Sequence, residues 1–243
     1  MITKYIFTSL MIVFSFLNAQ NLADETLRRL SNHLYGLDRS MIVQSHIVKN
    51  GKIKESQKVK VSTCWPKKKK EKRLTLVEYL EPKRKIGVKI WEIIYWTKPE
   101  GMKWMTMPLT GKLKDISNKK NIKSKFDFSE LYFSEEIILN YNNSILENSE
   151  NLIIESVSKN SNQKKLIFIN EKNKLIDKVE IYNNKSKLVK SILCEKFDSI
   201  DNNIFISKII IKDNKKKHEV IINITDFLIE NFTDLSIFEP KGK

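Results

Sequence analysis

The stretch Ile47-Val48-Lys49-Asn50-Gly51-Lys52-Ile53-Lys54 decides how the fold is interpreted. In this stretch, an Asn-Gly pair lies between two runs in which apolar and polar residues alternate. Asn-Gly suits the two central positions of a tight hairpin turn, where both residues take positive φ. The sequence therefore predicts a β-hairpin, with one strand from about Ser40 and a second strand up to about Trp65.

Further strand-like segments follow, and most are separated by short turns. They are Leu74–Leu80, Lys85–Trp96, Lys103–Met107, Leu152–Val157, Lys164–Asn170, Lys174–Asn183, Leu188–Phe197, Ile204–Lys212 and His218–Ile224. Successive strands with hairpin-sized connections favour an antiparallel meander, which as an open sheet must curl to hide one face. The predicted fold class is therefore mainly β, with a curled antiparallel sheet.

Two segments have a different periodicity. An early helix is predicted because apolar residues recur on one helical stripe, and Gly36 suits its C-terminal end. The stripe consists of Leu22, Leu27, Leu30, Leu34 and Leu37. The segment 126–140 has mixed periodicity, and we expect helical turns there that lie across the sheet as a lid.

The first 19 residues have the pattern of a secretory signal peptide. One basic residue, Lys4, precedes an apolar run that ends near Ala19, and we expect cleavage after Ala19. The run is short for a spanning helix, which needs roughly 20 residues, and no basic stop-transfer cluster follows it. An uncleaved N-terminal anchor is the alternative.

The mature chain, residues 20–243, is expected to be a single periplasmic domain. No Pro-, Gly- or Ser-rich linker divides it. Neither Cys64 nor Cys194 lies at the predicted cleavage site, where a lipid-carrying cysteine would have to stand. We therefore expect a soluble protein that is not itself lipidated.

The mature chain is strongly basic. The predicted leader holds one of the 44 Lys and Arg residues and none of the 29 Asp and Glu residues, which leaves 43 − 29 = +14. Nucleic acid is the poorest partner for an exported protein, and an anionic membrane surface or an acidic partner fits better. The abundance of Lys, Asn and Ile throughout the chain is equally what a compositional bias of the genome would produce.

Several passages resemble the LolA-like outer-membrane lipoprotein-sorting family. The passage from Tyr79 to Val88 is similar to a strand, proline turn, glycine and strand of that family, and 104–108 is similar to its tryptophan strand ending in proline. Leu113-Lys114-Asp115-Ile116 resembles the basic strand that follows, and Asp127-Phe128-Ser129 an Asp-Phe-Ser motif. Phe238-Glu239-Pro240-Lys241-Gly242 is similar to the terminal Phe-x-Pro segment.

The resemblance implies a half-barrel whose concave face is apolar and capped by helices. Such a protein would bind the acyl chains of lipoproteins or lipids and deliver them towards the outer membrane. The implied partners are an inner-membrane transporter and an outer-membrane acceptor. A lipid-binding accessory of an envelope transport system, and a sensor in an envelope stress system, are the alternatives.

Nine residues are candidates for lipid contact: Leu27, Leu30, Leu34, Trp91, Ile93, Tyr95, Trp104, Phe128 and Leu131. Strand alternation places Trp91, Ile93 and Tyr95 on one face, whereas Trp104 and Met105 point to opposite faces. The aromatic and methionine cluster cannot therefore line a single pocket as a whole. Ordinary core packing is the alternative role for these residues.

The sequence offers little for catalysis, metal binding or a cofactor. It has no Gly-x-Ser-x-Gly elbow, phosphate-cradling glycine loop or His-Glu-x-x-His helix. The three histidines are scattered, and no metal-ligand spacing surrounds either cysteine. We expect no enzyme, cofactor or metal, and a secreted hydrolase is the weakest alternative. Whether Cys64 and Cys194 form a disulfide stays open.

Overall fold

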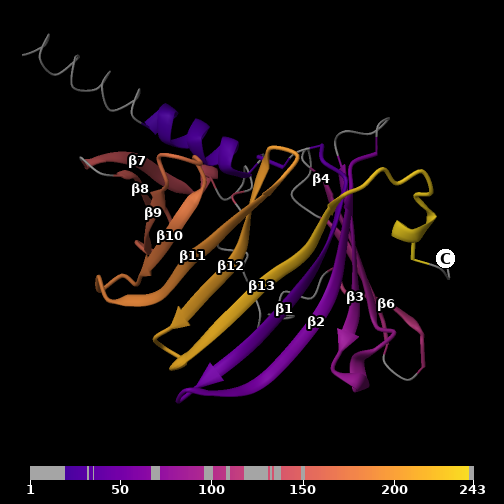
Figure 1. Ribbon diagram of the computed structural model, residues 1–243. Coiled ribbons are helices and arrows are strands. Elements are labelled where there is room, and N and C mark those ends of the chain that lie inside the picture. The colour runs from indigo at the N-terminus through magenta and orange to yellow at the C-terminus, as the bar shows by residue number, and fades with distance from the viewer. Residues whose placement is uncertain are drawn as a thin grey trace, which may run out of the picture. The chain divides into compact units, whose positions relative to one another are not determined.

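The structure is a computed structural model of the 243-residue chain. It describes residues 20–31, 33–34, 36–66, 72–95, 101–107, 110–117, 131, 133, 138–148 and 151–240. The predicted signal peptide lies outside the described residues, as does most of the predicted lid segment. Within the described ranges the chain is almost entirely β, after one N-terminal helix at residues 20–31 (Figure 1).

The strands form one antiparallel sheet that is not closed. They are β1 (Arg39–Lys49), β2 (Lys52–Cys64), β3 (Lys72–Glu81), β4 (Lys89–Tyr95), β5 (Met102–Thr106), β6 (Leu113–Asp115), β7 (Tyr141–Asn148), β8 (Asn151–Ser158), β9 (Lys164–Ile169), β10 (Ile176–Tyr182), β11 (Leu188–Ile200), β12 (Asn203–Asp213) and β13 (His218–Ile229). Two 3₁₀ turns accompany them, η1 (Lys83–Lys85) and η3 (Ser236–Phe238). The order β6-β5-β4-β3-β2-β1-β13-β12-β11-β10-β9-β8-β7 leaves β6 and β7 as edges. This arrangement confirms the predicted fold class.

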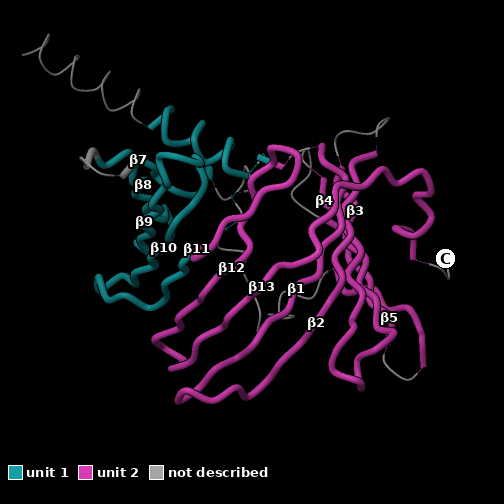
Figure 2. Tube along the Cα trace, in the orientation of Figure 1, with its two compact units in different colours: residues 1–33, 128–193 teal, residues 34–127, 194–243 magenta. Residues whose placement is uncertain are grey.

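The chain divides into two compact units (Figure 2). Unit 1 comprises Met1–His33 and Phe128–Leu193, and unit 2 comprises Leu34–Asp127 and Cys194–Lys243. Unit 1 therefore contains the N-terminal helix with β7 to β10, whereas unit 2 contains β1 to β6 with β12 and β13. Each unit is described by itself below.

The predicted hairpin is confirmed. Asn50 and Gly51 connect β1 to β2 with φ of 51° and 70°, the two positive values that a tight type I′ turn requires. The register runs from Lys49 opposite Lys52 back to Arg39 opposite Thr63. Because side chains alternate along a strand, this register fixes which residues share a face.

Most predicted strands are present, with two differences. β4 begins at Lys89 rather than Lys85, because residues 83–85 form the 3₁₀ turn η1. β7 was not predicted, since its first half, Tyr141-Asn142-Asn143-Ser144, is rich in residues of low β-propensity. Of the predicted lid segment, the structure describes only residues 131, 133 and 138–140, with a helical conformation at 138–139.

The predicted N-terminal helix is present but shorter than its leucine stripe. It ends at residue 31, and Gly36, at φ 74°, lies in the turn that leads into β1. Ala23, Leu27 and Leu30 are buried, whereas Leu22 is 55% exposed. The buried stripe thus begins at Ala23, and Leu22 lies off it.

Each unit buries aliphatic side chains in cross-strand rows. In unit 1, register partners on β8, β9, β10 and β11 form one row of fully buried residues. They are Ile154, Ile167, Val179 and Ile192, each 0% exposed. Burying such a side chain contributes roughly 1.5–3 kcal/mol relative to leaving it in water.

Candidate functional site

The sheet of unit 2 has two faces with different coverings. One face, here called the tryptophan face, carries Cys64, Leu74, Leu76, Trp91 and Trp104 as a buried cluster. Leu76 lies opposite Trp91, and Trp91 lies opposite Trp104, so the two indoles belong to neighbouring strands on the same face. This pairing depends on the register between β4 and β5.

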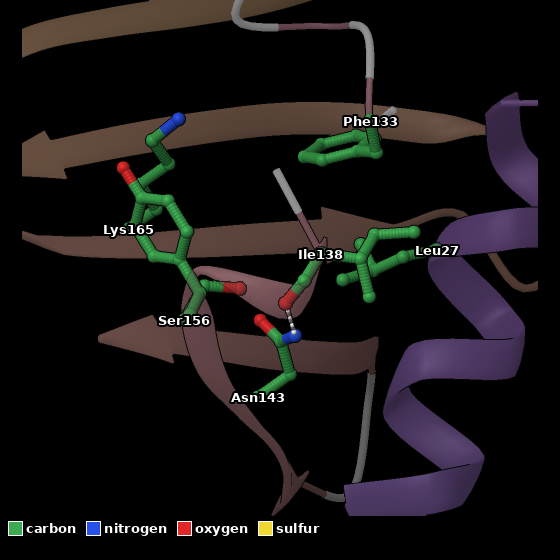
Figure 3. A pocket seen from close by; sticks show the side chains of 7 residues that line it. Leu27, Phe133, Ile138, Asn143, Ser156 and Lys165 are labelled. Carbon is green, nitrogen blue, oxygen red and sulfur yellow. Dashed lines mark hydrogen bonds between the residues drawn. The ribbon is translucent and has the colours of Figure 1, made fainter. Parts of the chain in front are cut away.

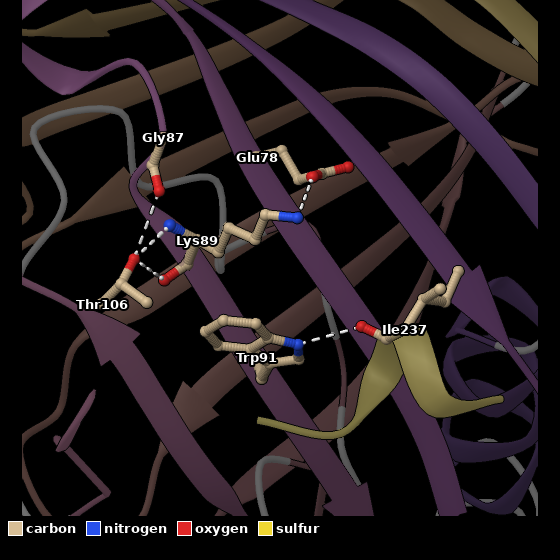
Figure 4. Close-up of polar contacts among 6 residues, drawn as sticks. All are labelled: Glu78, Gly87, Lys89, Trp91, Thr106 and Ile237. Atoms are coloured by element: carbon tan, nitrogen blue, oxygen red, sulfur yellow. Dashed lines mark hydrogen bonds and ion pairs between the residues drawn. The ribbon is translucent and has the colours of Figure 1, made fainter. Parts of the chain in front are cut away.

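The chain's own C-terminal segment covers the tryptophan face. Phe238, in η3, belongs to the same buried cluster and is 2% exposed, and Phe232 and Leu235 pack against it. The rings of Phe232 and Phe238 meet edge to face, with centroids 5.1 Å apart. The indole Nε1 of Trp91 donates a hydrogen bond of 3.0 Å to the carbonyl oxygen of Ile237 (Figure 4). This side of the sheet is therefore occupied by protein.

The opposite face of β1 to β5 carries a second set of apolar side chains, here called the apolar row. Direct register partners place one member on each strand: Met41, Val61, Val77, Ile90 and Met105. All five side chains are half-buried. They lie between the fully buried core and full exposure, so they offer apolar surface that a ligand can still cover.

The apolar row is bordered by a polar row, which lies two residues further along each strand on the same face. Its members are Arg39, Thr63, Thr75, Glu92 and Lys103, again direct register partners. The carboxylate of Glu92 lies 3.1 Å from the ammonium of Lys103. On the other side, Val43 and Val59 are buried and Tyr79 is half-buried. The face thus changes from charged to aliphatic within two pair positions.

Arg39 is the most unusual charge of this face. Burial, and then repulsion from Arg73, lowers its pKa from 12.5 to about 10, although Asp38 acts in the opposite direction. Its Nη1 donates to the carbonyl oxygens of Leu34 and Leu37 at 3.0 and 3.1 Å. Arg39 therefore fixes the turn that precedes β1.

Asp38 organises the adjacent end of β2. Its Oδ1 accepts a hydrogen bond of 2.7 Å from the backbone N–H of Trp65, and its Oδ2 accepts one of 3.5 Å from the thiol of Cys64. Burial, together with the neighbouring carboxylate, raises the pKa of Cys64 from 9.0 to about 12. Cys64 is therefore a neutral thiol at ordinary pH. Cys64 and Cys194 are both buried and are not joined in a disulfide.

Unit 1 contains a small cavity beneath the N-terminal helix (Figure 3). It is lined by Leu27, Phe133, Ile138, Tyr141, Asn143, Ser156 and Lys165. Its volume is about 10 Å³, which is room for about one water molecule. Asn143 Nδ2 donates to the carboxylate of Asp24 at 2.8 Å and to the carbonyl oxygen of Ile138 at 3.1 Å. The cavity is too small for an acyl chain.

The nine predicted lipid-contact residues fall into several environments. Leu27 and Leu30 are buried on the helix of unit 1, and Leu131 is half-buried. Trp91 and Trp104 are in the buried cluster of the tryptophan face, Ile93 packs against it, and Tyr95 and Leu34 are half-buried. Phe128 lies outside the described residues. Their contact with lipid stays a prediction.

Strand alternation was interpreted correctly, but the apolar row was missed. Trp104 faces Trp91 and Met105 faces Ile90, so these neighbours do point to opposite faces. Each of the five strands contributes one residue to the apolar row. The members are therefore far apart in the sequence, and no local pattern connects them. Pairs of positions that vary together among related sequences indicate which strand residues are partners, and such pairs would have revealed the row.

The described residues offer neither a metal site nor a spanning helix. No group of three or more His, Cys, Asp and Glu side chains in this part of the chain could hold a metal ion. Likewise, no helix among the described residues is long and apolar enough to cross a membrane.

Comparison with known families identifies the chain's relatives. A family model described as "Uncharacterized protein" matches residues 71–241, which is more than half of the chain. The chain belongs to this family. The match spans β3 to β13 and the C-terminal segment, so both faces of the unit 2 sheet include residues of the family region. No curated protein matches the sequence.

Several solved structures have a fold similar to that of this chain. A DUF1329 family protein from Desulfovibrio piger superposes with a TM-score of 0.73 at 15% identity, covering 91% of this chain and 97% of that one. A putative outer membrane lipoprotein-sorting protein domain from Vibrio parahaemolyticus gives 0.72 at 14%, with coverages of 90% and 97%. A LolA superfamily protein from Nitrosomonas europaea gives 0.63 at 16%, with coverages of 88% and 96%. The LolA-like fold is thereby confirmed.

Proposed function

We propose that the protein is a non-enzymatic periplasmic carrier that binds the acyl chains of lipoproteins or other lipids along the apolar row. The observation that carries this proposal is the row itself. Met41, Val61, Val77, Ile90 and Met105 form a continuous half-buried aliphatic strip across five strands. An acyl chain that lies across the strands matches both the shape and the chemistry of such a strip.

The covering of the other face favours this placement. The tryptophan face is closed by Phe238, and the Trp91 indole is hydrogen-bonded to the backbone of the segment that covers it. A ligand on that face would first have to displace the segment. Among the described residues, the apolar row is only half-buried, so it is the more accessible apolar surface of the sheet in this part of the chain.

The energetics suit a carrier rather than a catalyst. Each methylene group removed from water contributes roughly 0.8 kcal/mol, so one acyl chain gives appreciable affinity without any reaction. Met41 and Met105, at the two ends of the row, have flexible thioether side chains that adapt to ligands of different shape.

The proposed route runs from an inner-membrane transporter to an outer-membrane acceptor. It is supported by the fold shared with a putative outer membrane lipoprotein-sorting protein domain. Release of the cargo requires a partner protein that binds a low-affinity state of the carrier better than the cargo-bound state. Such a partner shifts the carrier towards the state that holds the cargo weakly. A lipid-binding accessory with another apolar cargo is the second candidate, and the bound molecule distinguishes the two.

Titration with a dansyl-labelled fatty acid tests the apolar row. Val77→Asp sets a charge in the row, and we expect it to weaken binding at least tenfold. Leu80→Asp is the matched control, because Leu80 lies on the same strand outside the apolar row, at the register irregularity between Tyr79 and Glu81, and is 39% exposed. Equal affinities of the two variants, with both folded by circular dichroism, would contradict the proposed site.

Native mass spectrometry of the protein purified from its own host tests the cargo. Co-purified triacylated lipoprotein would support lipoprotein sorting, and free phospholipid would support the accessory role. A protein that carries no lipid and binds none on titration would overturn both.

A further inference from the structure

Two neighbouring hairpin turns of unit 2 form one basic tip. The β1–β2 turn and the β12–β13 turn lie at the same end of adjacent strands, because β1 pairs with β13 and Val48 lies opposite Glu219 (Figure 1). Residues 49–54 and 212–218 make up this tip. They contain seven lysines, namely Lys49, Lys52, Lys54, Lys212, Lys215, Lys216 and Lys217, and one acidic residue, Asp213, and they are followed directly by Glu55 and Glu219.

The lysines of the tip are all exposed. Lys212 and Lys216 each lie 3.7 Å from the carboxylate of Glu219 and Asp213, respectively. The other five form no ion pair with any described residue. The excess of ammonium groups over carboxylates at this end of the sheet attracts anions.

The tip also stands clear of the strand beside it. β2 pairs with β3 only from Lys58 onward, where Lys58 lies opposite Glu81. Residues 52–56 therefore extend beyond the end of β3, and all of them are exposed.

An apolar side chain lies among the charges. Ile53 is 61% exposed and stands between Lys52 and Lys54 in the sequence. Lysines that flank an exposed aliphatic residue suit the interface of an anionic bilayer, where headgroups attract the ammonium groups and the acyl boundary accepts the isoleucine. A purely polyanionic partner, such as nucleic acid or an acidic protein segment, would leave Ile53 without a complementary environment.

We propose that this tip is a docking surface for an anionic lipid bilayer. The proposal goes beyond the acyl-carrier function, because it concerns how the protein reaches a membrane and not what it carries. Each lysine close to an anionic bilayer contributes about 1 kcal/mol, which is about fivefold in affinity, and the attraction falls off over a Debye length of about 10 Å at moderate salt.

Vesicle sedimentation tests the proposal on residues 20–243, which contain every described residue. The probes are vesicles of phosphatidylglycerol mixed with phosphatidylcholine, and vesicles of phosphatidylcholine alone. We expect binding to the anionic vesicles only, with loss at high salt. The triple variant Lys215→Gln, Lys216→Gln, Lys217→Gln should bind the anionic vesicles roughly a hundredfold more weakly than the wild type. Adding Ile53→Ser to this triple variant should lower the affinity again.

A matched control removes the same charge elsewhere. Lys172, Lys174 and Lys196 are exposed lysines outside the tip, and their triple glutamine variant should keep at least a third of the wild-type affinity. Equal losses in the two triple variants would overturn the assignment to the tip. So would equal binding to both vesicle types, or binding of polyglutamate by a protein that ignores anionic vesicles. Fatty-acid titration without vesicles should be unchanged in the tip variant, which separates this test from that of the carrier function.

Discussion

Trp91 and Ile237 are joined by a hydrogen bond of 3.0 Å from the indole Nε1 to the backbone carbonyl oxygen, although 146 positions separate them in the chain. This bond fastens the C-terminal segment to the middle of the sheet in unit 2. It satisfies the one polar atom of a buried indole, which would otherwise cost free energy. The tryptophan face is consequently part of the core, and the proposed ligand site therefore lies on the apolar row.

Phe238 should be the main apolar anchor of the C-terminal segment. Phe238→Ala is expected to lower the free energy of unfolding by about 3–5 kcal/mol, because the side chain is almost fully buried. Urea unfolding followed by tryptophan fluorescence measures the loss. Ile237→Ala, which truncates a 40% exposed neighbour, should cost less than about 1 kcal/mol. Similar losses in the two variants would contradict the described packing.

Leu27 should stabilise the helix of unit 1 through its buried side chain. Leu27→Ala is expected to cost about 2–5 kcal/mol, since the residue is 1% exposed beside the small cavity. Leu22→Ala removes the same side chain from an exposed position of the same helix and should be close to neutral. Thermal unfolding measured by circular dichroism compares the two, and a neutral Leu27→Ala would show that the helix does not pack as described.

Glycine should be required at position 51 because of its positive φ, and not because a larger side chain would clash with other atoms. A Cβ atom at this position would meet no atom within 4 Å, but φ is 70°. Gly51→Ala is therefore expected to cost about 1–2 kcal/mol from left-handed strain alone. The exposed neighbour variant Lys52→Ala should change stability by less than about 0.5 kcal/mol in urea unfolding. A Gly51→Ala protein as stable as the wild type would rule out the I′ turn.

The contribution of Cys64 to stability should depend on pH. Its pKa is raised from 9.0 to about 12 in the folded state, so the stability that it adds is complete below pH 9.0 and is lost as pH rises towards about 12. The cost of Cys64→Ala should therefore shrink above pH 9.0. Leu76→Ala, in the same cluster but without an ionisable group, should cost the same at every pH. Urea unfolding across this pH range checks both, and a cost of Cys64→Ala that stays constant would contradict the account.

The parts of the fold that have local signals were predictable from the sequence. Asn50-Gly51 specifies its own turn, and two-residue alternation is visible within each strand. The alternation also placed Trp104 and Met105 on opposite faces. β7 was missed because its first residues have low β-propensity, and the strand forms by pairing with β8, which is not visible in the β7 sequence alone.

The candidate site depends on register, which is a non-local property. Met41, Val61 and Val77 are far apart in the sequence and meet only because β1, β2 and β3 pair as they do. A shift of one residue would exchange the two faces of a strand. The C-terminal cover of the tryptophan face is equally non-local, although Phe238 had been noted in the passage that resembles the LolA-like family.

Photocrosslinking tests the central claim most directly. A fatty acid that carries a diazirine on its acyl chain would be bound to the protein and irradiated, and the modified residues would be located by mass spectrometry. If the acyl chain lies along the apolar row, the labels fall on Met41, Val61, Val77, Ile90 and Met105. Labels concentrated on Trp91 and Trp104, with the apolar row unmodified, would contradict it.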